Sequence, residues 1–314
     1  MKAVIPAAGI GKRLQPLTFI YPKPLLWLGK KRMMDYIMDS LMEIDLSEII
    51  IIAGYRGDML EEYLRKNYKQ NFTFVYQKEQ AGLGDAVLLG IENSKSNESE
   101  DMLVLLSDTI TDADMKKFTK KNRTRIAVKK VKDPKSFGIV NIEGKLITNL
   151  TEKPDKPLSD MAIIGLYYFS DIKRIEESLN YVKNSQMRTK NEFQLTDAMK
   201  HMLDSGEKME AFKVKQWIDC GNFEMFIDSN RELLKREELK NYCEKADIAD
   251  SAIGMNVSLF ENVRVKNSKL KNTVVFPGSV IENSTLSDSV VGKDCTIRNF
   301  KGSLICSDKT LIKK

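Results

Sequence analysis

The sequence predicts an α/β protein in which a three-layer, mainly parallel sheet is followed by a short left-handed parallel β-helix. In the amino-terminal part, apolar β-rich runs alternate with amphipathic runs of helical period, and that order implies right-handed crossovers and a parallel sheet. After about residue 242, long helical patterns stop and small polar residues alternate with Val, Ile and Leu. We therefore expect a sheet domain at residues 1–241 and a β-helix domain at residues 242–314.

Local patterns predict each element of the sheet domain. Apolar, β-branched runs predict strands at residues 3–6, 48–53, 72–76 and 102–107. Amphipathic spacing predicts helices at residues 33–42, 59–66 and 85–92, then after residue 193 and at 222–240. Polar residues 93–101 predict a surface loop, and residues 138–169 have the strand-dominated pattern of an inserted substrate-binding layer. Ligands are expected at the carboxyl ends of the parallel strands.

The carboxyl-terminal region carries a repeat. Aliphatic residues recur every six positions, at Val274, Val280 and Leu286 and again at Val291 and Ile297. This spacing resembles the hexapeptide pattern of left-handed parallel β-helices, with an irregular β-sandwich as the alternative. Acyltransferases built on such helices need a histidine base, and the only histidine is His201, which precedes the repeat. We therefore expect this region to serve assembly or regulation, and we expect a homo-oligomer.

Composition argues against several classes of function. The chain has 42% hydrophobic and 30% charged residues, which is ordinary for a globular protein, and a net charge of +6. Its lysine-rich segments, such as residues 116–121, lack interleaved aromatic residues, so nucleic-acid binding is not expected. No apolar run is long enough to cross a bilayer and no cleavable signal is evident, which predicts a cytoplasmic protein without a membrane partner. The four cysteines lack C-x-x-C spacing, so we expect buried, reduced thiols.

A glycine-rich loop with two cations follows the first predicted strand. Gly9 and Gly11 allow the backbone to approach a ligand closely, so that its amides point at phosphate oxygens. Arg13 and Lys23 add full positive charge. The spacing is neither that of a P-loop nor that of a G-x-G-x-x-G dinucleotide loop. The pattern predicts a phosphate-binding loop, and an ordinary turn with surface cations is the alternative.

Residues 3–18 and the Pro-Lys-Pro run at 22–24 together resemble the signature of the sugar-1-phosphate nucleotidyltransferases. Pro6 and Lys12 depart from the usual pattern, but the glycines and both cations are retained. The resemblance implies a Rossmann-like, GT-A-like sheet, Mg²⁺ as cofactor, and a nucleoside triphosphate and a sugar 1-phosphate as substrates. It also implies nucleotide contacts in the loop at Ala8, Gly9 and Gly11.

A second glycine loop resembles the nucleobase clamp of the uridylyl- and thymidylyltransferases in this family. In those enzymes a Gln lies five residues before a Gly-Leu pair, as Gln77 lies before Gly82. The resemblance implies that the Gln77 amide and the backbone at Gly82 contact the base. Because a Gln amide can donate to a carbonyl and accept from a ring N–H, this arrangement suits uracil or thymine. An ordinary polar loop residue is the alternative for Gln77.

Two apolar strands are each followed by an aspartate. Asp108 follows the strand predicted at residues 102–107, and Asp219 lies in a run, residues 217–221, that is similar to the family's Trp-x-Asp-x-Gly. Two carboxylates brought together would repel each other unless a cation neutralised them, and oxygen ligands suit Mg²⁺. We therefore predict Asp108 and Asp219 as metal ligands. Ser107 and Thr109 depart from the family's usual residues at the first of these sites.

Further runs are similar to the family's sugar-phosphate pocket and occur in the same order along the chain. The residues that the resemblance assigns to this pocket are Gly138, Glu152, Lys153, Ile163, Glu192 and Thr196. It implies that Glu152 accepts hydrogen bonds from sugar hydroxyls and that Lys153 holds the sugar phosphate. An ionised carboxylate suits a polyol because it can only accept hydrogen bonds. For Glu192 and Thr196, a simple helix start at residues 192–197 is the alternative.

These resemblances imply direct, in-line nucleotidyl transfer. A phosphate oxygen of the sugar 1-phosphate attacks the α-phosphorus of the triphosphate and pyrophosphate leaves, so catalysis is charge neutralisation plus positioning. The residues expected to carry the reaction are Arg13, Lys23, Asp108, Lys153 and Asp219. The sequence offers no Ser–His or Cys–His pair for a covalent route.

The leading hypothesis is a glucose-1-phosphate uridylyl- or thymidylyltransferase. Within the same class, mannose 1-phosphate, N-acetylglucosamine 1-phosphate or another nucleotide is the alternative. A GT-A glycosyltransferase would also use a nucleotide-binding sheet and an aspartate–metal site, but it would consume sugar nucleotides and release no pyrophosphate. A nucleotide-sensing subunit would have no activity.

Overall fold

The structure is a computed structural model that describes residues 1–94 and 101–313. The chain divides into two compact units, one formed by Met1–Gly9 with Ile37–Trp217 and the other by Ile10–Tyr36 with Ile218–Lys314. The surface loop predicted at residues 93–101 lies largely outside the described residues. The boundary expected between residues 241 and 242 stays a prediction.

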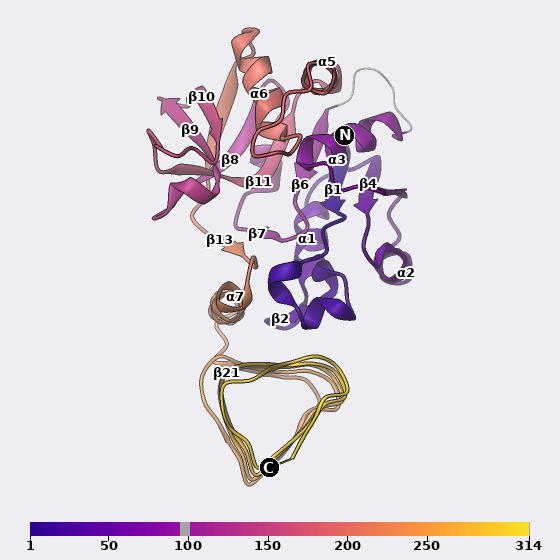
Figure 1. Cartoon of the computed structure of the whole chain (residues 1–314), viewed down its shortest axis with the longest axis vertical. Helices are drawn as coiled ribbons and strands as arrows, with labels where there is room; N and C mark the ends of the chain where they lie inside the picture. Colours follow the sequence, from indigo (N-terminus) through magenta and orange to yellow (C-terminus); the bar gives the residue numbers. More distant parts are fainter. Residues whose placement is uncertain (95–100, 314) are drawn as a thin grey trace. The chain divides into compact units, whose positions relative to one another are not determined.

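The first unit is built on a nine-stranded sheet with the order β5-β4-β1-β6-β11-β8-β12-β10-β9 (Figure 1). Its strands are β1 (Lys2–Ala7), β4 (Glu48–Ala53), β5 (Phe72–Tyr76), β6 (Met102–Leu105), β8 (Thr124–Lys130), β9 (Gly138–Glu143), β10 (Leu146–Glu152), β11 (Met161–Phe169) and β12 (Met209–Lys213). All of them run in one direction except β10 and β11, which are antiparallel to their neighbours. The predicted mainly parallel sheet is confirmed.

Helices cover both faces of this sheet. They are α1 (Met33–Leu41), α2 (Gly57–Asn67), α3 (Leu83–Glu92), α4 (Met115–Phe118), α5 (Ile172–Asn184) and α6 (Leu195–Asp204). Apolar residues of α3, α5 and α6 form one core with strand residues such as Val4 and Val104. On the opposite face of β1, Ala3 and Ile5 are buried as well, as a three-layer arrangement requires. At Gly90 a Cβ would come within 2.9 Å of a Val4 methyl, so this glycine allows α3 to pack closely on β1.

The strand-dominated stretch at residues 138–169 extends the same sheet and does not form a separate layer. β9 and β10 pair antiparallel at its edge, whereas β11 lies between β6 and β8. The register of β11 against β8 shifts between Ile163 and Tyr167, around Gly165 with φ +83°. This irregularity bends β11 beside the end of β6, where Leu106 donates its amide to the Gly165 carbonyl at 2.9 Å.

The second unit begins with the glycine-rich segment. Residues 10–36 form the 3₁₀ turns η1 (Lys12–Leu14), η2 (Leu17–Phe19) and η3 (Lys23–Leu25), then the short pair β2 (Trp27–Leu28) and β3 (Lys31–Arg32). After β13 (Trp217–Asp219), helix α7 (Phe223–Arg236) starts at Asn222, whose side chain accepts the Met225 amide. The helix ends at Arg236, before the end predicted at residue 240.

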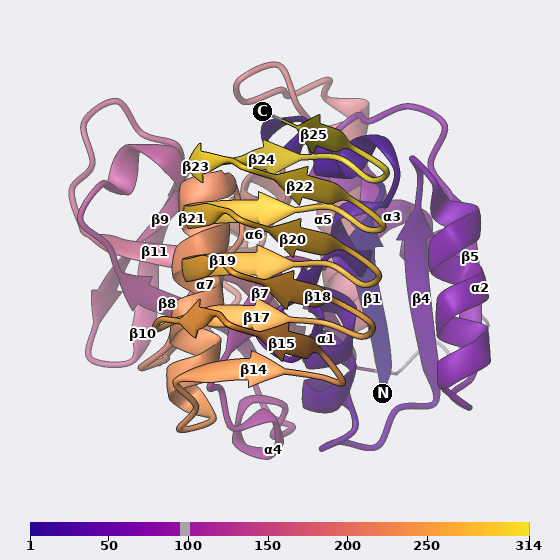
Figure 2. The same cartoon turned by 90° about the horizontal axis from the view of Figure 1, so that it is seen from below.

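The carboxyl-terminal region is a parallel β-helix, whose stacked coils are visible in Figure 2. Its strands are β14 (Asn241–Cys243), β15 (Asp247–Ala249), β16 (Ala252–Ile253), β17 (Val257–Leu259), β18 (Arg264–Lys266), β19 (Lys269–Val275), β20 (Val280–Glu282), β21 (Thr285–Val291), β22 (Thr296–Arg298), β23 (Lys301–Gly302), β24 (Ile305–Cys306) and β25 (Leu311–Lys313). The predicted left-handed β-helix is confirmed. Its repeat differs from the expected one, because Arg264 pairs with Val280 and Val280 with Thr296, a spacing of 16 residues.

Residues with left-handed backbone conformation form the corners of these coils. They are Asn256, Asn262, Asn267, Asn272, Gly278, Asn283, Asp288, Asp294 and Asn299. Asn, Asp and Gly adopt this conformation at a lower cost than other residues. The corners are separated by six, five and five residues in turn, so a strict period of six fails. The interior is filled by Val275, Ile281 and Leu286, whereas Val274 and Val280 are not part of that core.

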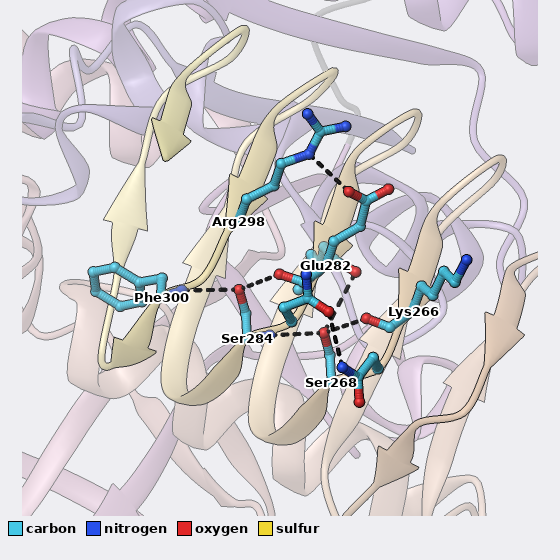
Figure 3. Close-up of polar contacts among 9 residues, drawn as sticks. Lys266, Ser268, Glu282, Ser284, Arg298 and Phe300 are labelled. Carbon is cyan, nitrogen blue, oxygen red and sulfur yellow. Dashed lines mark hydrogen bonds and ion pairs between the residues drawn. The ribbon is translucent and has the colours of Figure 1, made fainter. Parts of the chain in front are cut away.

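Polar side chains tie successive coils together (Figure 3). The Ser268 hydroxyl accepts the Ser284 amide at 3.0 Å, and the Ser284 hydroxyl accepts the Phe300 amide at 3.1 Å. Each hydroxyl also donates to the carbonyl two residues earlier. On the outer face, Arg298 Nε donates to a Glu282 carboxylate oxygen at 2.7 Å. The hydroxyls of Ser268 and Ser284 thus accept hydrogen bonds from backbone amides at the corners that have no partner in the strand pairing.

Two further expectations concern membranes and thiols. Within residues 1–94 and 101–313, no helix combines the length and the apolar character needed to cross a membrane. All four cysteines are free, and Cys220, Cys295 and Cys306 are buried as expected. The expectation is wrong for Cys243, which is exposed because its strand β14 lies at the end of its sheet and pairs with β17 alone.

Candidate active site

A cavity of about 240 Å³ in the first unit gathers three separate parts of the chain. We call it the β1–α3 cavity, and its lining residues are Pro6, Ala8, Gly9, Gln77, Gln80, Gly82, Leu83, Ala86 and Glu192. It lies where β1 and β5 end and α3 begins. Among the residues predicted from the sequence, Ala8, Gly9, Gln77, Gly82 and Glu192 meet here.

A side-chain hydrogen bond and a close backbone approach hold the walls of this cavity in place. The Gln80 side-chain nitrogen donates to the Ala8 carbonyl at 3.0 Å, which links the two glycine loops. Gly82 has φ +121°, and a Cβ there would lie 2.4 Å from the Phe193 carbonyl oxygen. This position therefore requires glycine, and the close approach brings Glu192 to the same cavity.

The Gln77 side chain has a defined orientation. Its amide nitrogen donates to Asp85 Oδ2 at 2.6 Å. Asp85 lies in the first turn of α3, where the helix dipole favours a negative charge. The bond uses one N–H of the Gln77 amide and fixes which side of the amide carries the oxygen.

Four of the predicted sugar-phosphate residues meet around Gly138 at the start of β9, whereas Glu192 lines the β1–α3 cavity. A Cβ on Gly138 would lie 3.0 Å from Glu152 Oε2, 3.1 Å from Ile163 Cδ1 and 3.4 Å from Thr196 Oγ1. Thr196 also donates its hydroxyl to Glu152 Oε2 at 2.7 Å. The structure thus brings together four residues from β9, β10, β11 and α6 that are far apart in the sequence.

Charge in this cluster centres on Glu152. Its side chain is only 10% exposed, and its charge adds to burial in raising the pKa of Tyr167 above the usual range. Lys153 Nζ lies 3.7 Å from Glu152 Oε1 and is 40% exposed, so this cation remains accessible to an anionic ligand. Burial also raises the pKa of Asp197, which accepts a hydrogen bond from the Thr189 hydroxyl at 2.9 Å.

Asp108 lies in the turn between β6 and β7 (Thr109–Thr111). The Ser107 amide donates to the Pro6 carbonyl at 3.4 Å, so this turn lies beside the end of β1. Thr109 is buried and donates its hydroxyl to the Ile164 carbonyl at 2.8 Å. Thr109, one of the two residues that depart from the resembled pattern, therefore holds the Asp108 turn against the irregular part of β11.

In the second unit, the glycine loop is adjacent to Lys23. Gly11 has φ +69°, and a Cβ there would lie 3.0 Å from Thr18 Cγ2 and 3.3 Å from Lys23 Cβ. Thr18 also donates its hydroxyl to the Gly11 carbonyl at 3.0 Å. Both conformation and crowding therefore require glycine at this position.

Arg13 and Asp219 meet beside Gly221 in the same unit. A Cβ on Gly221 would lie 3.4 Å from Arg13 Nη2 and 3.3 Å from Asp219 Oδ1. Asp108 belongs to the first unit, so a metal shared by the two aspartates stays a prediction. Within the part of the chain that the structure describes, no group of three or more His, Cys, Asp or Glu side chains could hold a metal.

Two residues near these clusters were not predicted as site residues. Gln80 is an exposed loop residue, and nothing in its sequence spacing marks the bond to Ala8. The buried Trp217 Nε1 has no hydrogen-bond partner among the described residues, and the ring packs edge-on against Phe137 at 5.3 Å. For Trp217, its place in the run at residues 217–221 was a signal that could have been used.

The two glycines of the first loop are expected to respond differently to alanine. Gly11→Ala should lower the free energy of unfolding by about 1–2 kcal/mol, because alanine is strained at φ +69°. Gly9→Ala should leave stability unchanged, since no atom beyond the neighbouring residues lies within 4 Å of the added methyl group, but it should block the close approach of a ligand to the loop. Thermal unfolding and equilibrium binding measure both effects. Equal losses of stability in the two variants would contradict this assignment.

Comparison with known proteins places these features in a family. Residues 2–236 match the model of the nucleotidyl transferase family. The chain is 32% identical over 238 residues to the bifunctional protein GlmU of Methanocaldococcus jannaschii, covering 75% of this chain and 55% of that protein. It is 26% identical to a glucose-1-phosphate thymidylyltransferase of Streptomyces antibioticus, covering 93% of this chain and 81% of the relative.

A solved structure supports the same placement. The structure of a UDP-glucose pyrophosphorylase complexed with UDP-glucose matches with a TM-score of 0.65 and 26% identity, over 75% of this chain and 98% of that chain. The fold, the glycine loops and the family match agree with one another. The chain therefore belongs to the nucleotidyl transferase family.

Proposed function

We propose that this protein joins glucose 1-phosphate to UTP or dTTP, forming the nucleotide sugar and releasing pyrophosphate. The family supports nucleotidyl transfer to a sugar 1-phosphate as the reaction class. The observation that carries the proposal is the convergence of Ala8, Gly9, Gln77 and Gly82 on the β1–α3 cavity. That cavity offers backbone amides for phosphates and the Gln77 side-chain amide for a base.

Among the pyrimidines, Gln77 favours a base with a ring N–H. With one amide N–H donated to Asp85, the Gln77 oxygen accepts from the base N–H and the remaining amide N–H donates to a base carbonyl. Uracil and thymine present that pair of groups. Cytosine lacks the N–H, so it is expected to be the poorer substrate.

The cluster around Gly138 is proposed as the sugar-phosphate site. Glu152 Oε2 already accepts the Thr196 hydroxyl, which orients the carboxylate toward further donors from a sugar. Lys153, next to Glu152 and partly exposed, holds the attacking phosphate. Arg13 stabilises the departing pyrophosphate and Lys23 the α-phosphate, so the like charges of the two substrates can approach.

We also propose that Asp108 and Asp219 bind a divalent metal, Mg²⁺ in the first instance. Two carboxylates suit an ion that usually keeps water and phosphate oxygens as its other ligands. When bound, the metal supplies additional positive charge for the phosphates.

The experiment is a matrix of four triphosphates against glucose 1-phosphate, mannose 1-phosphate and N-acetylglucosamine 1-phosphate, with Mg²⁺ and a pyrophosphate assay. The proposal predicts the highest kcat/KM for glucose 1-phosphate with UTP or dTTP. A higher value for another pair would establish the alternative sugar or base within the class. Consumption of a nucleotide sugar without pyrophosphate release would contradict nucleotidyl transfer.

Gln77→Ala should reduce base discrimination without unfolding the protein. We expect the ratio of kcat/KM for UTP to that for CTP to fall about tenfold, since two hydrogen bonds to the base are lost. Gln80→Ala, which removes a neighbouring amide of the same cavity, is the matched control and should keep the ratio. An unchanged ratio in Gln77→Ala would remove Gln77 from the base site.

A further inference from the structure

One outer face of the β-helix is buried in a way that its own coils do not explain. Val257 and Leu259 of β17 fill the interior, and Ser258 between them faces outward. Ser258 is nonetheless fully buried, and so is Val274, with which it pairs on the neighbouring strand β19. The ring of Phe276, just beyond β19, is fully buried as well.

Residues of the glycine-rich segment contact this face. The Trp27 ring lies 5.0 Å from Phe276 and 6.4 Å from Phe260, measured between centroids. Tyr21 packs edge-on against Trp27 at 5.2 Å. These residues lie between or just beyond the proposed catalytic cations Arg13 and Lys23.

A buried polar contact reinforces the packing. Asn230 of α7 accepts the Gly29 amide at 2.9 Å, and Ser258 Oγ lies 2.7 Å from the Gly29 carbonyl oxygen and 2.9 Å from Asn230 Oδ1. Gly29 has φ +61°, and a Cβ there would lie 3.0 Å from Leu233 of α7. The segment, α7 and the β-helix therefore join at one point.

The most direct link to the catalytic segment is Tyr21. Its hydroxyl donates to Asp308 Oδ2 at 2.9 Å, and Asp308 Oδ1 accepts the Lys293 amide at 2.8 Å. Asp308 follows β24 in the last part of the β-helix, so it is held by the coil before it. Burial and the bond to Asp308 raise the Tyr21 pKa, so the hydroxyl stays protonated and remains a donor.

We infer that the β-helix positions Arg13 and Lys23 for catalysis, with Tyr21 and Asp308 as the positioning residues. This inference rests on the proposed function, because it assigns a cause to the placement of those cations. A segment that carries two phosphate-binding cations must be held to within a fraction of an ångström, since a misplacement of about 1 Å can cost about 100-fold in rate. The β-helix provides that support from its outer face.

Tyr21→Phe in the full chain tests this inference. The ring and its contact with Trp27 are kept while the bond to Asp308 is lost, so we expect kcat to fall about tenfold and KM for the triphosphate to rise. KM for the sugar 1-phosphate should not change. A purely structural role would instead lower the unfolding temperature and leave kcat unchanged at a temperature well below it.

A second variant and a matched control complete the test. Asp308→Asn should also lower kcat, and the double variant should be no worse than Tyr21→Phe if the two residues act through one bond. Tyr242→Phe is the control, because its hydroxyl pairs with Glu244 within the β-helix, and it should keep the wild-type kcat. Wild-type kinetics in Tyr21→Phe, or an equal loss in Tyr242→Phe, would overturn the inference.

Arg13→Ala distinguishes a failure of the positioning inference from a failure of the proposed function. If Arg13→Ala is inactive while Tyr21→Phe is normal, the positioning role alone is wrong. If Arg13→Ala is fully active, the catalytic assignment of the segment is wrong. Equilibrium binding of UTP to Arg13→Ala and to Tyr21→Phe should be measured as well. It compares the two variants without catalysis.

Discussion

Asp108→Asn is expected to lower kcat by about 10²- to 10⁴-fold and to leave the fold intact. Asparagine has nearly the same shape, so the turn after β6 should persist with its Ser107 and Thr109 bonds, which do not involve the Asp108 side chain. Under the proposed function, the lost charge weakens metal binding, since a neutral amide is a poorer ligand than a carboxylate. Pyrophosphate release measured across a range of Mg²⁺ concentrations checks both effects.

The matched control for this variant is Asp114→Asn. Asp114 caps α4 by accepting the Lys117 amide at 3.0 Å, and asparagine caps equally well. The same change of charge six residues away should therefore leave kcat unchanged. An Asp108→Asn protein with near-normal turnover and the same Mg²⁺ dependence would remove Asp108 from the proposed site.

Lys23→Ala is expected to lower kcat by about 10²- to 10³-fold, because under the proposed function the α-phosphate loses a positively charged partner in the transition state. The stem of Lys23 lies against Gly11, so the loop should tolerate a shorter side chain there. Single-turnover rates with saturating UTP and glucose 1-phosphate separate this loss from a change in binding. Circular dichroism and thermal unfolding confirm that the variant is folded.

Lys12→Thr is the control for Lys23→Ala. It removes one positive charge from the same loop. We expect a kcat within about threefold of the wild type, because Lys12 is exposed and has no assigned phosphate. Equal losses in the two variants would show that only the overall charge of the loop matters.

Much of the first unit could be predicted because its signals are local. Residues 49–53 of β4 are apolar throughout, as a strand buried on both faces requires, and the helices α1 to α3 occur within two residues of the predicted bounds. The cluster of Gly138, Glu152, Ile163 and Thr196 was predicted from motif order alone, and its members do meet. Asp108 follows its strand as expected.

Other features depend on contacts that leave no regular spacing in the sequence. The aliphatic spacing predicts a β-helix repeat of six residues, but the corners are separated by six, five and five residues in turn, and the informative signal is the Asn, Asp or Gly at each corner. The structural role of Thr109 depends on Ile164, which lies on a strand 55 residues away. The association of residues 10–36 with the β-helix in one unit, through Trp27 and Tyr21, involves residues more than 200 positions apart.

Exchange of labelled pyrophosphate into UTP or dTTP tests the central claim most directly, because direct transfer has no intermediate on the protein. Label should enter the triphosphate only when glucose 1-phosphate and Mg²⁺ are present, since the reverse reaction needs the complete nucleotide sugar. Exchange without any sugar phosphate would reveal a nucleotidyl group held by the protein and would contradict in-line attack. An absence of exchange with every sugar 1-phosphate and triphosphate would contradict nucleotidyl transfer itself.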